Sequence, residues 1–349
     1  MRVPVAALLI VLSVMTSFGA NRYGLIAGQN TGGASVDPLR FAEADAGRFA
    51  QILHDYAGVE TGNLRILLRP DSMSLMTAGN HLADEINHLD DPSQATLFFY
   101  YSGHADNEGL LLDSTHCTFA AINKLINGIS AGIRIAIFDA CQSGVVVAFK
   151  GGMRAEPFFF DNRQKSQGEV WIASASANER AQESATLKSS LFSFHLFTGL
   201  RGSADLSADN RVTVSEAYQY AYSKTLETSA LTTGILQHPV YRFNLSGEGD
   251  IVITDLSERR GGILVDGSCK GTFLIMSRNY TDVFADFSKE KGRENFIALS
   301  SGDYIIINAR GGDDIGLYRF SIGGRKTVRC SNDLFRASLL PYRKEASVK

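Results

Sequence analysis

Two short segments carry the residues with the clearest chemical potential. Ser102-Gly103-His104-Ala105 follows one apolar run, and Asp139-Ala140-Cys141-Gln142-Ser143-Gly144 follows another. A thiol becomes a useful nucleophile near neutral pH when a base stands beside it, and histidine is the usual base. The neighbouring glycines allow sharp turns that bring amide N–H groups towards a developing oxyanion. The pattern predicts a His–Cys site, although a single cysteine at a strand end is more often a packing residue.

The elements that must position these segments form an alternating series. Apolar runs predict strands at 23–28, 65–68, 95–101, 133–138 and 170–173, with a further strand at 241–245. Helical spacing predicts helices at 39–56, 75–89, 119–129, 190–200 and 214–225. Alternating elements with strands apolar on both faces indicate an α/β fold with a parallel sheet covered on both sides. Ligands gather at the carboxyl ends of such strands, where His104 and Cys141 both lie.

The texture changes near residue 250, where short apolar runs are separated by Gly, Asp, Asn and Ser. This pattern predicts a small all-β, sandwich-like domain. We therefore divide the chain into a leader at 1–20, an α/β domain at 21–248 and a β domain at 249–349.

The first 20 residues resemble an export signal. Arg2 precedes an apolar stretch at 3–15, and small residues follow at Ser17, Gly19 and Ala20. The stretch is shorter than the roughly 20 residues that span a bilayer. We expect a periplasmic or secreted protein with no membrane association after signal removal; the alternatives are an uncleaved anchor or a wrongly assigned start.

Composition excludes some classes of function. The formal net charge is −3, from 34 Lys and Arg against 37 Asp and Glu. Nucleic-acid-binding proteins normally carry a strong basic excess, so we expect no nucleic-acid partner. Four cysteines in 349 residues are too few for a disulfide scaffold, so apolar packing must hold the fold.

Taken together, the two motifs resemble those of the caspase-like cysteine peptidases, on the metacaspase and bacterial orthocaspase side. Three further stretches agree with that family, at 44–46, 174–183 and 191–205. The resemblance extends over roughly residues 22–245 and implies a caspase-like, mostly parallel sheet with helices on both faces.

The resemblance also implies roles for individual residues. Cys141 would be the nucleophile that forms a thioester, and His104 the general base or acid. The backbone N–H groups of Cys141 and Ala105 would form the oxyanion hole. Ala105 stands where glycine is commoner, and Gln142 where histidine is common in metacaspases. Neither difference removes a catalytic group.

Substrate preference follows from three further positions. Asp45 and Asp139 resemble the acidic pocket of the Arg/Lys-specific branch, and Ser102 resembles a third pocket position. A desolvated carboxylate binds a guanidinium through charge-assisted, bidentate hydrogen bonds. We expect protein or peptide substrates with Arg or Lys before the scissile bond. For Asp45 the alternative is a favourable interaction with a helix N-terminus.

A possible calcium loop runs from residue 205 to 216. Asp205, Ser207, Asp209 and Glu216 have the spacing of oxygen ligands in a twelve-residue calcium loop. The competing interpretation is that Thr213 and Glu216 form a capping box for the next helix. No cofactor is required for the predicted chemistry itself.

Two other features leave alternatives open. The stretch 146–168 contains four basic residues and predicts a long loop, either cut by the enzyme itself or left intact. Cys269 and Cys330 could pair in an oxidising compartment, closing a loop worth roughly 4 kcal/mol. Cys117 would stay free or pair with another chain.

The role of the β domain is open between binding and stabilisation. A rival to the peptidase hypothesis is a catalytically inactive, caspase-fold scaffold that acts through this domain. The presence of both His104 and Cys141 favours the enzyme, because an inactive scaffold is free to lose either residue.

Overall fold

The computed structural model describes residues 21–34, 36–141, 143–148, 167–246, 249–258, 261–311 and 314–337. The predicted signal at 1–20 and most of the predicted loop at 146–168 lie outside these ranges. The two ends of that stretch are regular rather than loop: α4 spans Gly144–Ala148, and β8 begins at Gln167. The loop prediction is therefore wrong at both ends.

A six-stranded sheet forms the centre of the α/β part, in the order β12-β8-β7-β3-β1-β2. Its strands are β1 (Arg22–Gly28), β2 (Leu64–Leu68), β3 (Thr96–Ser102), β7 (Ile133–Asp139), β8 (Gln167–Ala173) and β12 (Val240–Ser246). All neighbouring pairs are parallel except β12 with β8, which is antiparallel. This confirms the mostly parallel sheet. Both β1 and β3 are buried along their whole length, which explains their continuous apolar sequence.

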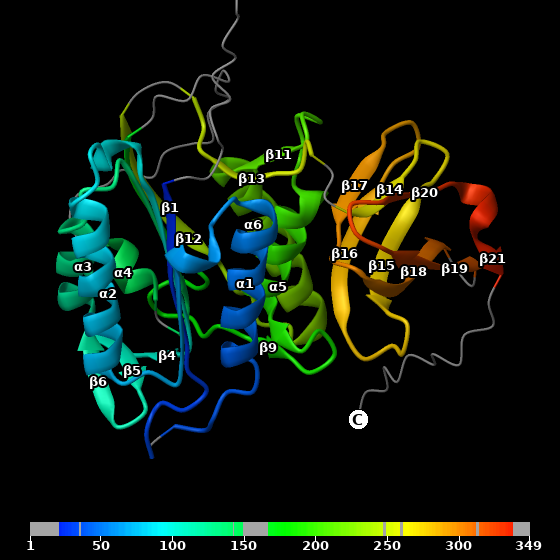
Figure 1. Ribbon diagram of the computed structural model, residues 1–349. Coiled ribbons are helices and arrows are strands. Elements are labelled where there is room, and N and C mark those ends of the chain that lie inside the picture. The colour runs from blue at the N-terminus through cyan, green and yellow to red at the C-terminus, as the bar shows by residue number, and fades with distance from the viewer. Residues whose placement is uncertain are drawn as a thin grey trace, which may run out of the picture.

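Helices cover both faces of this sheet (Figure 1). One face carries α1 (Ala42–Tyr56), α5 (Leu191–Thr198) and α6 (Val214–Thr232); the other carries α2 (Ser72–Asn87), α3 (Phe119–Asn127) and α4. Each face has its own apolar core, with Phe49 and Phe197 in one and Leu82 and Ile122 in the other. Side chains cap several helices: Asp71 caps α2, and Thr213 with Glu216 forms the capping box of α6.

Several small elements were not expected from the sequence. The strands β4 (His104–Ala105), β5 (Gly109–Leu112) and β6 (Thr115–Thr118) form a three-stranded sheet directly after β3. The hairpin β9 (Glu183–Ser184) and β10 (Ser189–Ser190) precedes α5. The helix expected at 190–200 ends at Thr198 and continues as a π-helical turn at Gly199–Ser203. Single 3-10 turns lie at Thr61–Asn63, Pro92–Gln94 and Asn332–Leu334.

The C-terminal part is all-β, as predicted. One sheet has the order β17-β14-β20 and the other β16-β15-β18-β19-β21. The strands are β14 (Gly262–Val265), β15 (Gly271–Ser277), β16 (Val283–Lys289), β17 (Asn295–Ala298), β18 (Gly302–Gly311), β19 (Asp314–Ile322), β20 (Thr327–Cys330) and β21 (Arg336–Ala337). Their inner faces share a third apolar core that includes Phe273, Phe287 and Ile306. This is the packing of a β-sandwich.

This β-sandwich packs against the helices of the α/β part. Figure 1 shows α5 and α6 between the central sheet and the sandwich. The connecting strand β13 (Val252–Asp255) pairs with β11 (Arg211–Thr213), which precedes α6. Ile253 and Phe296 belong to the same core cluster as Phe49. The two parts therefore share apolar packing as well as backbone pairing.

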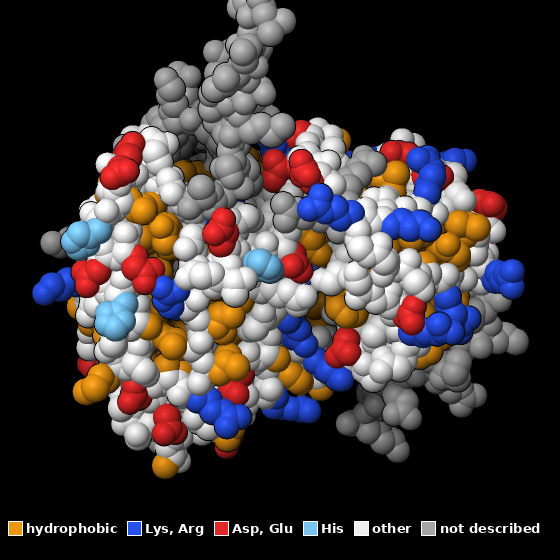
Figure 2. Space-filling model, in the orientation of Figure 1, with side chains coloured by type: hydrophobic (Ala, Val, Ile, Leu, Met, Phe, Trp, Pro, Cys, Tyr) orange, Lys and Arg blue, Asp and Glu red, His pale blue; other side chains and the backbone are white. Residues whose placement is uncertain are grey.

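The surface is mixed in charge. On the face shown in Figure 2, Lys and Arg side chains are interspersed with Asp and Glu over both parts of the molecule. Within the described ranges, no helix is both long enough and apolar enough to cross a membrane.

Candidate active site

Three strand ends meet at one edge of the sheet and carry the two reactive segments. Ser102 at the end of β3 is in register with Asp139 at the end of β7 and with Gly28 at the end of β1. The Gly103 N–H donates to Asp139 O at 3.1 Å, which holds the two chain ends together where they leave the sheet. The two reactive segments therefore leave the sheet from neighbouring strands, β3 and β7.

The residues from Tyr101 to His104 suit the turn that joins β3 to β4. The hydroxyl of Tyr101 donates to His104 O at 2.8 Å and to Leu111 O at 3.3 Å, so it fixes the turn and the start of β4. A Cβ on residue 103 would overlap the Tyr101 hydroxyl, which is why glycine is needed there. The side chain of Tyr101, at the end of β3, therefore holds the backbone of His104 in place.

The imidazole of His104 is half-buried and packs against Gly32. A Cβ on residue 32 would lie 2.8 Å from both the Cβ and the Cδ2 of His104. The buried Nε2 has no hydrogen-bond partner in the part of the chain that the structure describes. This nitrogen therefore has an unused hydrogen-bonding position.

Cys141 occupies a tight turn between β7 and α4. The Ser143 hydroxyl donates to Ala140 O at 2.7 Å, and a Cβ on Gly144 would meet Ala177 N at 2.5 Å. The turn thus needs glycine at 144 to approach the backbone after β8. The Cys141 Sγ, partly exposed, lies 4.0 Å from Ala181 O.

Burial holds both reactive side chains in their neutral forms. Desolvation raises the pKa of the Cys141 thiol. Desolvation lowers the pKa of the His104 imidazole, although hydrogen bonding to the backbone of Asp37 and Asn30 opposes the change. At neutral pH the pair is therefore a thiol and a neutral imidazole rather than an ion pair.

Asp139 is buried with one carboxylate oxygen unsatisfied. Its Oδ2 accepts short hydrogen bonds from the hydroxyls of Ser190 and Ser193, at the start of α5. Its Oδ1 has no hydrogen-bond partner among the described residues, and the side chain is only 3% exposed. Desolvation raises the pKa of this carboxyl, against the opposing effect of the hydroxyls of Ser190, Ser193 and Ser174. A buried, unpartnered acceptor is costly, so this oxygen is a candidate for binding a donor from outside the chain.

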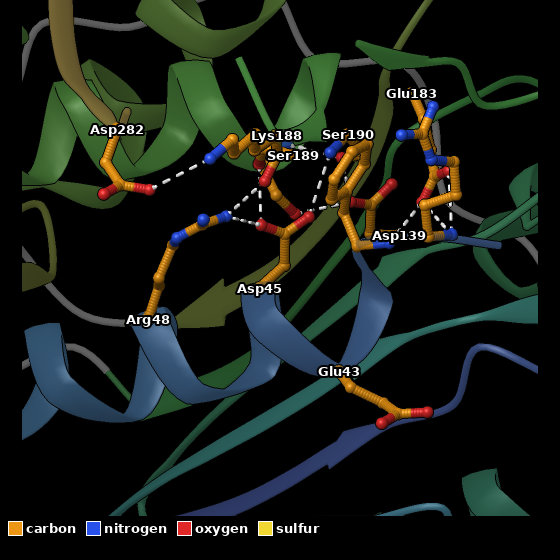
Figure 3. A network of polar contacts seen from close by, with 12 residues as sticks. Glu43, Asp45, Arg48, Asp139, Glu183, Lys188, Ser189, Ser190 and Asp282 are labelled. Atoms are coloured by element: carbon orange, nitrogen blue, oxygen red, sulfur yellow. Dashed lines mark hydrogen bonds and ion pairs between the residues drawn. The ribbon is translucent and has the colours of Figure 1, made fainter. Parts of the chain in front are cut away.

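Asp45, by contrast, is fully engaged (Figure 3). From α1 its Oδ1 accepts from Ser189 Oγ at 2.7 Å and from Arg48 Nη1 at 2.8 Å, and its Oδ2 accepts from Ser190 N at 2.9 Å. Desolvation raises the pKa of Asp45 to about 7, against the opposing effect of these hydrogen bonds. Asp45 therefore holds β10 in place beside Asp139, and both carboxylates meet at Ser190.

The surrounding segment is tied down from several directions. Glu183 accepts from the backbone N–H groups of Arg40 and Phe41, just before α1 begins. Lys188 forms an ion pair with Asp282 of the C-terminal part, with Nζ and Oδ1 3.7 Å apart. Figure 3 shows these contacts on either side of Asp45 and Asp139.

The residues predicted for calcium do not fit an ion in this arrangement. Glu216 accepts from the N–H groups of Leu206 and Ser207 through one oxygen and of Thr213 through the other. Asp205 accepts from two backbone N–H groups in the same loop. Across the described ranges, no group of three or more His, Cys, Asp or Glu side chains is placed to hold a metal ion.

The predicted residues thus fall into two groups. His104, Ala105, Cys141, Asp139 and Ser102 stand at one edge of the sheet, with Asp45 reaching it from α1. Of the residues predicted for calcium, Asp205, Ser207 and Asp209 lie in the loop before α6 instead, and Glu216 lies in the first turn of that helix.

Sequence reasoning missed three supporting features. These are the hydroxyls of Ser190, which caps α5, and of Ser193 within α5, the contact of Gly32 with His104, and the buried amide of Gln237. Gln237 donates to Ser174 O and accepts from Gln182 N, which links the ends of β8 and the 181–182 segment. The only sequence signal for any of these features was the Ser190-x-x-Ser193 spacing at the start of a mainly apolar helix.

Comparison with known proteins adds the following findings. The family model for the caspase domain (peptidase C14) matches residues 21–241. A crystal structure of caspase-1 from Spodoptera frugiperda is 14% identical, with a TM-score of 0.45, and the match covers 67% of this chain and 90% of that chain. No curated protein matches the sequence.

Proposed function

The chain belongs to the caspase family of peptidases, and from this premise we propose that it is an exported cysteine endopeptidase that cleaves after Arg or Lys. The observation that carries the specificity is the unpartnered Oδ1 of Asp139, buried beside the start of α5. A substrate guanidinium or ammonium supplies the donor and positive charge that this oxygen lacks. This acidic site is the basis for placing the protein on the metacaspase and orthocaspase side.

The proposed mechanism uses the two neutral side chains. The Cys141 thiol turns from Ala181 O towards His104, whose Nε2 takes the proton as Sγ attacks the substrate carbonyl carbon. The N–H groups of Cys141 and Ala105 stabilise the oxyanion. His104 then protonates the leaving amine, and water hydrolyses the thioester. Proton transfer during attack replaces a preformed thiolate, consistent with the pKa directions of both groups.

The experiment that tests this proposal is labelling with an activity probe bearing a basic residue. We expect covalent labelling of the wild type and none of Cys141→Ala. A probe with Asp in place of the basic residue should label far less. Absence of Cys141-dependent labelling in reducing buffer, with and without calcium, would favour the inactive scaffold, and preference for the Asp probe would overturn the assigned specificity.

Gly32→Ala should impair catalysis without unfolding the chain. The new Cβ would stand 2.8 Å from the His104 side chain and 2.7 Å from Val36 Cγ2, so the imidazole must move. Misplacement of a catalytic group by about 1 Å costs on the order of 100-fold in rate. We expect kcat/KM on an Arg peptide to fall about 10- to 100-fold, measured together with the urea midpoint.

The matched control is Gly47→Ala, because a Cβ at this position in α1 meets nothing within 4 Å. It should retain full activity. If Gly32→Ala were as active as Gly47→Ala, the proposed placement of His104 would be wrong.

Cleavage should rise with pH through about 7. In the free enzyme Asp45 titrates at about 7, and its charged form draws the cationic substrate towards the adjacent Asp139. The pH profile of kcat/KM reports groups of the free enzyme. We expect the pH profile of kcat/KM on an Arg peptide to show an acid limb near pH 7 and Asp45→Asn to lose it. If the limb were unchanged in Asp45→Asn, a group other than Asp45 would be responsible for it.

The same titration should appear in stability. The folded-state pKa of Asp45 is raised above its unfolded value of about 3.9. The contribution of this carboxyl to the free energy of unfolding is therefore fully present below the unfolded pKa and is lost as pH rises through about 7. Urea midpoints measured from pH 5 to 8 should therefore fall less in Asp45→Asn than in the wild type.

Three untested predictions complete the proposal. Export is tested by following the N-terminus of the protein recovered from the expressing cell. Self-cleavage within 146–168 is tested by comparing intact masses of the wild type and Cys141→Ala. The calcium hypothesis is tested by activity in chelator, with and without added calcium.

A further inference from the structure

Two buried cysteines lie side by side in the β-sandwich, far from the catalytic residues in sequence. Cys269 and Cys330 are both 0% exposed and belong to the same apolar core. Cys117 lies in a different core, on the α2 and α3 face of the central sheet. The sandwich therefore contains one pair of neighbouring thiols.

Backbone contacts bring these thiols together. Cys330 ends β20, which runs parallel to β14, and Asp266 at the end of β14 donates its N–H to Cys330 O at 2.9 Å. A turn then returns the chain, with Cys269 N donating to Asp266 O at 3.2 Å. The Cys269 Sγ lies 3.6 Å from Cys330 O and 4.0 Å from Asp266 Oδ1, and each thiol influences the pKa of the other.

A buried ammonium locks this turn. Lys289 is 7% exposed, and its Nζ donates to Asp266 O and Cys269 O, both at 2.9 Å, and to Glu290 O at 3.2 Å. The Asp266 carboxylate is held by Ser268 and by Arg329. The position of Cys269 is thus fixed by charged and polar contacts that do not involve its sulfur.

We propose that Cys269 and Cys330 form an intrachain disulfide when the chain folds in the presence of a disulfide-bearing oxidant. One thiolate attacks the oxidant RS–SR, which forms a mixed disulfide and releases RS⁻. The second thiolate attacks the protein sulfur of that mixed disulfide, forming the S–S bond and releasing a second RS⁻. The two cysteines lose two protons and two electrons, and the oxidant becomes two RSH.

Burial dictates when this reaction takes place. Desolvation raises the pKa of both thiols in the folded chain, which makes their thiolates scarce. The pair is therefore oxidised as the sandwich forms, before the core closes over it. The inference does not depend on the proposed peptidase activity.

The test is a thiol count on the full chain, carried as Cys141→Ala to prevent proteolysis. The protein is unfolded, refolded with reduced and oxidised glutathione, acid-quenched, and alkylated in denaturant without reductant. We expect one alkylated thiol of the three present and a peptide pair joining Cys269 to Cys330, with a mass lower by two hydrogens. Three alkylated thiols, or pairing of either cysteine with Cys117, would overturn the proposal.

Stability provides a second measurement, the comparison of the oxidised with the reduced protein. The disulfide closes a loop between residues 61 positions apart, which restricts the unfolded chain. The unfolding equilibrium constant should be about 30- to 1,000-fold smaller in the oxidised than in the reduced protein. Cys117→Ser should keep this difference, whereas Cys330→Ser should remove it; equal midpoints for the oxidised and reduced forms would contradict the proposal.

Discussion

Replacement of Asp139 by Asn should lower kcat/KM on Arg and Lys peptides about 100- to 1,000-fold while the fold is retained. Removing one partner of a buried charge pair costs roughly 2–5 kcal/mol, and each 1.4 kcal/mol is tenfold. Asparagine keeps the shape and can still accept hydrogen bonds from Ser190 and Ser193, but it offers no charge to a guanidinium. Steady-state kinetics on matched Arg, Lys and citrulline peptides measure the effect.

The comparison with citrulline separates specificity from general damage. A citrulline peptide has the shape of arginine without its charge, so Asp139→Asn should affect its cleavage much less. Asp84→Asn, an exposed carboxylate on α2, is the matched control and should leave both rates unchanged. Equal losses on Arg and citrulline peptides would show that Asp139 supports the turn at Cys141 rather than the substrate charge.

The burial of the Asp139 and Asp45 carboxyls should also lower the free energy of unfolding of the chain. Asp139 and Asp45 are buried carboxyls whose pKa values are raised, so ionising them at neutral pH opposes folding. Asp139→Asn should therefore be at least as stable as the wild type at pH 8. In the proposed function, this loss of stability accompanies the ability of Asp139 to bind a cationic substrate.

The position of the site was predictable because it depends on local sequence and on one general rule. The continuous apolar runs of β3 and β7 identify buried parallel strands, and the ends of neighbouring parallel strands lie at one edge of the sheet. His104 and Cys141 follow those runs directly. Their placement at the same edge of the sheet therefore follows from the position of each residue after its strand and from the pairing of β3 with β7.

The parts that could not be predicted depend on contacts distant in sequence. The contact of Gly32 with His104 joins residues about 70 positions apart. Gln237, which follows α6 in the sequence, binds Ser174 and Gln182, which precede α5. Neither residue type has a pattern that indicates its partner. The strands β4 to β6 were missed because two to four residues are too few to show alternation.

Helix α5 shows how the C-terminal part bears on the site. All eight of its residues are buried, the five apolar ones as well as the polar Ser193, His195 and Thr198. A helix of this composition is covered on all faces. Figure 1 places the central sheet on one side of α5 and the sandwich, with β16, on the other. The same helix presents Ser193 to Asp139, so the sandwich supports the proposed substrate site through α5.

Deletion of residues 249–337 should therefore prevent the α/β part from folding cooperatively. The deletion would expose the outer face of α5 and remove Ile253, Leu264 and Phe296 from a shared core. It would also remove two acceptors of the buried Arg22 guanidinium, which donates to Val252 O, Ile253 O and Ala57 O. We expect loss of the thermal unfolding transition in circular dichroism and of Cys141 labelling.

A point substitution tests the same coupling without a deletion. Arg22→Met leaves three buried carbonyl groups without their donor, at about 1 kcal/mol or more each, so it should destabilise the full chain by about 3 kcal/mol. Arg65→Met, which removes a partly exposed ion pair with Glu85, should cost less than about 1 kcal/mol. If the truncated chain melted cooperatively and Arg22→Met matched Arg65→Met, the sandwich would be an independent appendage, and its function would have to lie in binding rather than in support of the active site.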